Sequence, residues 1–185
     1  WLQDETIAHY RQQALERYIA TGLPTRRNER WKYAQLDGLI QQGFVTPLQS
    51  DWAQSIPVEL LSDAISIVLL DGQIQSHLST MDALPAGVSV TSLADLSLQQ
   101  LQYYQEKIAL LSQSDRPFTQ LNIALCHVGF LLHIEAGVHC LPPIEILHLH
   151  TQDQAPVQQQ SHHMICLEPG AQAVVFERYQ SSSEE

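Results

Sequence analysis

The pattern of the chain changes at Gly129, and this change constrains the fold more than any other feature of the sequence. Before it, helical periodicity and short strand-like runs alternate, whereas after it only short apolar runs and turn residues follow. Two of the turns, Ala136-Gly137 and Pro169-Gly170, each come directly after an apolar run that ends in Glu. This repetition is typical of stacked coils in a β-solenoid, but an antiparallel meander gives a similar pattern. Strands are predicted over 130–135, 144–150, 163–168 and 173–179.

Upstream of Gly129 the sequence predicts helices with defined ends. Gly22 stands where the first helix should be capped, and Gly43 ends a second, shorter one. An Asp-Gly pair, Asp71-Gly72, lies between two apolar runs and predicts a β-hairpin, because Gly accepts a positive φ. A short strand is expected over 88–90. Helices are predicted over 6–20, 28–42, 97–111 and 117–126, and the hairpin over 64–74.

Composition narrows the class of protein. The 185 residues are 44% hydrophobic, which is typical of a soluble globular chain with a core. The net charge of −11 opposes non-specific binding to nucleic acid or to an anionic membrane surface. Three widely spaced cysteines, Cys126, Cys140 and Cys166, form no disulfide framework, and this favours a reducing compartment. We expect them to be small buried side chains.

The strongest candidates for a chemical site are histidines. His148 and His150 are two residues apart in a predicted strand, so their side chains share one face. With His162, His163 or Cys166 they would form a metal site, as in a cupin-like β-barrel. The residues after His150 contain neither the Glu nor the Gly that such a site requires. Solvated or hydrogen-bonded strand histidines are the alternative, and adjacent Cys126 and His127 point in different directions.

A basic segment stands out against the acidic chain. GLPTRRNERWKYAQL, residues 22–36, holds four of the nine Lys and Arg residues between Arg26 and Lys32, next to Trp31 and Tyr33. Such a run could stack on and pair with nucleic acid, but the overall charge opposes that. We instead expect a docking segment in which Trp31 is buried and the arginines pair with nearby carboxylates.

Several stretches together resemble a known family. The segment 22–36 resembles the N-terminal signature of the SufB/SufD family of iron–sulfur cluster assembly proteins, in its SufD branch. Three more regions agree in order and spacing, over most of the chain. They are IVLLDG at 67–72; FTQLNIAL at 118–125 with GFLLHIEAGV at 129–138 and PIEILHL at 143–149; and HMICLEPGAQA at 163–173.

The resemblance implies an α+β fold, with an N-terminal helical region followed by the first coils of a right-handed parallel β-helix. It implies three parts: a helical region at 1–60, a mixed strand and helix connection at 61–116, and the start of the β-helix core at 117–185. The segment 22–36 would clamp the helices to the β-helix, with Trp31 as the anchor. Because the chain lacks an initial Met and ends directly after a strand, we expect it to be the N-terminal portion of a longer protein.

The resemblance also implies a function. Family members of this kind are cytoplasmic, non-catalytic scaffold subunits that pair with SufB and, through a C-terminal region beyond these residues, with the SufC ATPase. The complex holds an iron–sulfur cluster transiently and is associated with reduced flavin and ATP, and we expect this chain alone to bind no cofactor. No catalytic, cofactor-binding or metal residue is transferred, because the family's late β-helix histidine and cysteine match no position here. We expect the open end of the last coil to pair with itself, since its backbone groups lack partners.

Two other classes of function stay open at this point. A small metal-binding β-barrel would use His148 and His150 and would need antiparallel strands. A plain interaction module would bind a partner through its helices alone. Neither nucleic acid nor a membrane is expected as a partner.

Overall fold

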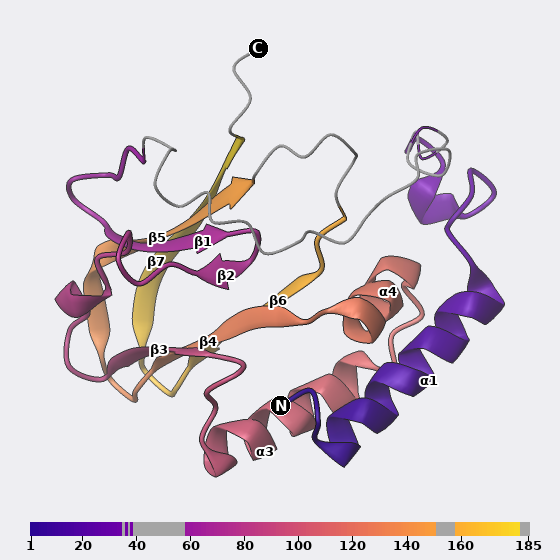
Figure 1. The fold of residues 1–185 in the computed structure, drawn as a ribbon, viewed down its shortest axis with the longest axis horizontal. Coiled ribbons are helices and arrows are strands. Elements are labelled where there is room, and N and C mark those ends of the chain that lie inside the picture. Colours follow the sequence, from indigo (N-terminus) through magenta and orange to yellow (C-terminus); the bar gives the residue numbers. More distant parts are fainter. Residues whose placement is uncertain (35, 37, 39–57, 151–157, 182–185) are drawn as a thin grey trace.

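The computed structural model describes residues 1–34, 36, 38, 58–150 and 158–181. The helices gather on one side of the molecule and two β-sheets on the other (Figure 1). This arrangement confirms a mixed α+β fold. The described helices are α1 (Glu5–Thr21), α3 (Leu98–Leu111) and α4 (Pro117–Leu125), with 3-10 turns η1 (Glu29–Trp31) and η3 (Met81–Ala83). The described strands are β1 (Ile65–Leu70), β2 (Gln73–Ile74), β3 (Val88–Ser92), β4 (Val128–Ile134), β5 (His139–His150), β6 (Ser161–Leu167) and β7 (Gln172–Ser181).

Helix α1 confirms the helix predicted over 6–20, and its two ends have clear local causes. The Asp4 carboxylate accepts hydrogen bonds from the backbone N–H groups of Thr6 and Ile7, both at 3.0 Å. These bonds, above all the one from Ile7, lower the pKa of Asp4. At the other end Gly22 adopts a φ of +69° and donates its N–H to the Tyr18 carbonyl.

Helices α3 and α4 also lie where the sequence predicts them. Ser97 and Gln100 form a reciprocal capping box at the start of α3, and Pro117 occupies the first turn of α4. Two arginines of α1 complete the other ends of these helices, since Arg17 donates to the Ser112 carbonyl and Arg11 to the Cys126 carbonyl. Carbonyls at helix ends lack intrahelical partners, so these bonds tie α1 to both helices. The buried residues of this cluster are Ile7, Ala14, Leu93, Tyr104, Ile108, Ile123 and Ala124.

The helix predicted over 28–42 is only partly described. Its first residues form the 3-10 turn η1, Gly38 is helical, and residues 35, 37 and 39–57 lie outside the described residues. The Asn28 side chain accepts a hydrogen bond from the Thr25 N–H at 2.8 Å, which favours a turn over a continuing helix. Trp31 is half-buried and lies against Phe118 of α4, with ring centroids 5.1 Å apart. Its described ring contact is therefore with a helix and not with a strand.

The predicted hairpin is confirmed as β1 and β2, which pair antiparallel. Its turn places Asp71 at φ +45° and Gly72 at φ +80°. Two consecutive positive φ values are the signature of a type I′ turn, which explains the Asp-Gly pair. A side chain at Gly72 would also collide with the side chain of Val128, which begins β4.

The strands form two sheets, in the orders β2-β1-β5-β7 and β3-β4-β6. The first strand of each sheet pairs antiparallel with its neighbour: β2 with β1, and β3 with β4. The remaining neighbours are parallel: β1 with β5, β5 with β7, and β4 with β6. The core between the sheets contains Ile67, Leu69, Val88, Phe130, Leu132, Ile134, Cys140, Ile144 and Ile146.

The last four strands repeat in order. We call β4 with β5 the first strand pair and β6 with β7 the second strand pair. Each residue of β4 lies beside the residue 33 positions later in β6, and β7 starts on β5 with the same offset. An irregularity between Cys140 and Ile144 shifts the rest of that ladder. The right-handed β-helix expected from the sequence, and the proposed division at residues 60 and 116, stay predictions.

Candidate functional site

The predicted histidine pair lies on the inner face of β5. His148 and His150 share that face with Ile146, and their nearly parallel rings are 6.5 Å apart between centroids. Tyr179 of β7 stacks on His148 at 4.4 Å and on His150 at 6.2 Å. The shared face that the two-residue spacing predicts is therefore confirmed, and an aromatic stack spans the two strand pairs.

Only one of the three further predicted ligands joins this pair. His163 of β6 lies 5.4 Å from His148 between ring centroids and stacks on Phe130 at 4.4 Å. Its neighbour His162 points to the helical side, where its Nδ1 is 3.3 Å from the Tyr104 hydroxyl. Cys166 shares that outer face, and its hydrogen bond with Tyr103 raises the pKa of that tyrosine to about 12. Adjacent strand residues point to opposite faces, so His162 and His163 separate.

Burial disfavours the charged form of two of these histidines, His148 and His163. Burial lowers the pKa of His148, although the Glu177 carboxylate opposes this shift. Burial and the neighbouring His148 lower the pKa of His163 to about 4. The His148 Nε2 and Glu177 Oε2 atoms are 3.5 Å apart, a contact too poor to count as a hydrogen bond. Glu177 instead accepts a hydrogen bond from the Tyr179 hydroxyl at 2.6 Å, which raises the pKa of Tyr179 to about 12.

The cluster does not support the metal-binding barrel. Across the described residues, no three His, Cys, Asp or Glu side chains are arranged so that they could hold a metal ion. The strand that carries His148 and His150 is parallel to both of its neighbours, whereas the barrel required antiparallel strands. Two neutral imidazoles, a phenol and one carboxylate at this end of the sheets are better suited to packing against a further aromatic or polar layer.

Sequence reasoning missed a buried ion pair on the opposite face of the same sheet. Glu145 of β5 is fully buried and contacts Arg178 of β7 at 2.8 Å. Its second oxygen accepts a hydrogen bond at 2.6 Å from Ser66 of β1. The 33-residue spacing of the turn glycines Gly137 and Gly170 does not give this pair, because the ladder shifts after Cys140 and places Phe176 beside Glu145. Arg178 lies two residues further along β7 and reaches Glu145 diagonally.

The two glutamates that come before the turns have different surroundings. Glu135 is exposed, as expected of a turn carboxylate. Glu168 is instead held by two groups of the first strand pair: His133 Nε2 at 2.9 Å and the Ala136 N–H at 3.1 Å. The carboxylate therefore bridges the two strand pairs at their turns.

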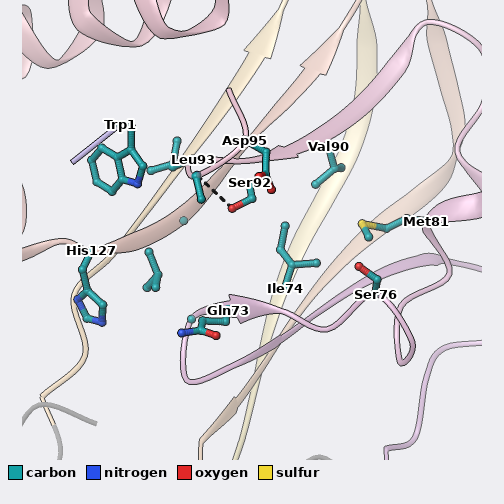
Figure 2. A pocket seen from close by; sticks show the side chains of 14 residues that line it. Trp1, Gln73, Ile74, Ser76, Met81, Val90, Ser92, Leu93, Asp95 and His127 are labelled. Atoms are coloured by element: carbon teal, nitrogen blue, oxygen red, sulfur yellow. Dashed lines mark hydrogen bonds between the residues drawn. The ribbon is translucent and has the colours of Figure 1, made fainter. Parts of the chain in front are cut away.

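A groove of about 500 Å³ lies beside β2 and β3, at the opposite edge of the sheets from β6 and β7. Apolar side chains from η3, β2 and β3 line it, among them Met81, Ile74 and Val90. Figure 2 shows Asp95 and His127 on different sides of the groove, so they do not converge on one point. Asp95 and His127 therefore do not form an acid–base pair in this groove. Among the described helices, none combines the length and apolar character that crossing a bilayer would need.

Comparison with known proteins adds an independent finding. The family model that describes the N-terminal region of SufBD proteins matches residues 3–146. An iron–sulfur cluster assembly SufBD family protein of Synechocystis sp. is 24% identical over 180 residues, which are 96% of this chain and 40% of that protein. The iron–sulfur cluster assembly protein SufD of Escherichia coli is 28% identical over 179 residues, which are 92% of this chain and 38% of that protein. The chain thus spans about two fifths of the length of these curated relatives.

Proposed function

The chain belongs to the SufBD protein family, and from this premise we propose that it acts in iron–sulfur cluster assembly as part of a SufD-type scaffold subunit. The match of the N-terminal family region over residues 3–146 carries the proposal. In the proposed role the chain is not an enzyme. It holds partners in position, and the reactive chemistry belongs to the complete assembly.

The structural side of the proposal is a right-handed parallel β-helix that starts with the two strand pairs. Its support is the register, in which β6 lies parallel beside β4 and β7 parallel beside β5. Strands that recur in the same order and direction extend by adding one coil at a time. A further coil would add one strand beside β6 and one beside β7, which are the outer strands of their sheets.

The proposed partners follow from the family. The whole subunit would pair with SufB and would bind the SufC ATPase through a region that these 185 residues do not contain. The complex, rather than this chain, would handle the transient iron–sulfur cluster, the reduced flavin and ATP. The three cysteines are free thiols, which supports a cytoplasmic, reducing environment for the proposed complex.

Self-pairing of the 185-residue chain is a further part of the proposal. Strands β6 and β7 present backbone groups along their outer sides, and such edges pair readily with another chain. We expect a concentration-dependent dimer in sedimentation velocity. A chain that stays monomeric at every concentration would contradict this pairing and leave the family assignment intact.

Co-purification tests the scaffold role. The tagged chain, and a longer product if its gene encodes one, are each co-expressed with a SufB-type and a SufC-type protein of the same genome. We expect the longer product to retain both partners, and the 185-residue chain to lose the ATPase. A longer product that retains neither partner would overturn the scaffold proposal.

A further inference from the structure

The basic segment of residues 26–32 is exposed and fixed in place. Arg26, Arg27, Arg30 and Lys32 are all exposed side chains. With one acidic residue, Glu29, among them, four basic residues give the segment a net charge of +3, whereas the chain as a whole carries −11. Such a reversal of sign over seven residues creates a local field unlike that of the surrounding surface.

Two contacts fix the segment in place. The Asn28 side chain closes the turn through the Thr25 N–H at 2.8 Å, and Trp31 packs on Phe118 at 5.1 Å between ring centroids. An anchored loop loses less conformational freedom on binding than a free one, so its charges are better placed to hold a partner.

The fold makes little use of the charge on Arg30. Arg30 approaches Asp115 only to 3.9 Å, and both side chains are largely exposed. Exposed pairs of this length contribute little to stability. For Arg30, the pairing with a nearby carboxylate that the sequence predicted is thus one long contact. A guanidinium group held this weakly is suited to a carboxylate of another molecule.

An aromatic ring stands beside the charges. Tyr33 is 90% exposed, and the Lys32 ammonium lies 5.6 Å from its ring centroid. Arg and Tyr are the residue types that most often dominate protein–protein contacts. A nucleic-acid strand would need several stacking rings and would run over the acidic remainder of the surface, whereas a short peptide would not.

We propose that residues 26–33 form a docking surface for an acidic protein segment. Carboxylates of that segment pair with Arg27 and Arg30, and one of its side chains packs on Tyr33. At physiological ionic strength charges more than about 8 Å away are largely screened, so the distant acidic residues do not prevent such binding. The inference does not depend on the proposed assembly role.

Fluorescence anisotropy with two labelled probes of equal charge tests the inference: an oligo-glutamate peptide and an oligo-thymidylate strand. The test variant is Arg27→Gln/Arg30→Gln. The control, Gln99→Glu/Gln102→Glu, changes the net charge equally at exposed positions near the start of α3, far from the segment (Figure 1). Acidic residues there are compatible with the helix, so both variants should fold.

The parent chain should bind the peptide more tightly than the oligonucleotide. The arginine variant should bind the peptide about tenfold more weakly, and the control should bind it like the parent. An equal loss in the control would show a response to bulk charge and overturn the inference. Tighter binding of the oligonucleotide, or no binding of either probe by the parent, would also overturn it.

Discussion

Leu132 of β4 and Ile165 of β6 are neighbours in one ladder, yet Leu132 is fully buried and Ile165 is 41% exposed. The same contrast holds one sheet away, where His148 of β5 is 5% exposed and its neighbour Tyr179 of β7 is 64% exposed. Residue type does not explain the difference, because leucine and isoleucine are equally apolar. The second strand pair lies beside the first in the stack, whereas no described strand lies beyond the second.

The comparison teaches that burial in a stack depends on the next strand pair. The first strand pair carries the stability of the β region, whereas the second offers inner-face side chains and strand edges to another layer. The largest expected effects should therefore come from the first pair and from the residues that tie the second pair to it.

Arg178→Met should give the largest loss in the free energy of unfolding. Such a loss would show that the second strand pair also contributes to the stability of the first. Arg178 belongs to the second pair, yet it neutralises the buried Glu145 of the first. Removing it leaves an unpaired buried carboxylate, at a cost of about 4 kcal/mol in the free energy of unfolding. Urea denaturation measures this cost. The double variant Glu145→Leu/Arg178→Met should recover most of it, and a single variant as stable as the parent would contradict the prediction.

Leu132→Ala and Ile165→Ala test the comparison directly. Truncating the fully buried Leu132 removes packing on all sides and should lower the unfolding free energy by about 3 kcal/mol. Truncating the partly exposed Ile165 should lower it by about 1 kcal/mol, since much of its surface is already in water. Equal losses in urea denaturation would show that the second pair is covered in solution.

Trp31→Ala extends the comparison to the helical side. The half-buried Trp31 ring packs only partly, on Phe118, so we expect a loss of about 2 kcal/mol rather than that of a fully buried tryptophan. Thermal unfolding followed by circular dichroism measures the effect. Tyr33→Ala, which removes an exposed ring two residues away, should change the unfolding free energy by less than about 0.5 kcal/mol. Identical melting curves for parent and Trp31→Ala would refute the anchoring role.

Local features of the fold could be predicted from the sequence, and the family too. Caps at Gly22 and the Asp71-Gly72 turn depend on residues close in the chain, so α1 and the hairpin were found. The resemblance seen in residues 22–36 is confirmed by the family match. The 3-10 turn at residues 29–31, where a helix was predicted to begin, has a local cause as well: the Asn28 side chain bonds the backbone of its own turn.

Pairing between distant residues could not be predicted. Strand alternation places His148 and His150 on one face, but it does not say that this face is the inner one. The parallel ladder of β1 with β5 joins residues 79 positions apart, such as Ser66 and Glu145. Such contacts depend on the packing of whole sheets, which no local pattern records. The candidate site was therefore found as a pair of histidines, without Tyr179 or Glu177.

His163→Phe should change the free energy of unfolding least. Its effect should depend on pH, and this dependence tests the contact between the two strand pairs. His163 links the strand pairs, between Phe130 of β4 and His148 of β5, with Glu177 and His162 also near. Its pKa is about 4 in the folded chain, against the ordinary value of 6.5. Below pH 6.5 the unfolded chain takes up a proton there and the folded chain does not. The stability of the parent therefore falls as the pH drops from 6.5 toward 4.

Phenylalanine keeps the stacking on Phe130 and removes the proton site, so it should flatten this part of the profile. At pH 5.5 the parent should have lost about 1 kcal/mol from this group, a loss that the variant avoids. Urea denaturation at several pH values between 4 and 8 measures the difference. At pH 8 both chains carry no charge at this position, so their comparison isolates the packing effect. Profiles that run parallel from pH 8 to pH 4 would mean that His163 is not desolvated by the first strand pair, and that the contact between the pairs is looser than the ladders indicate.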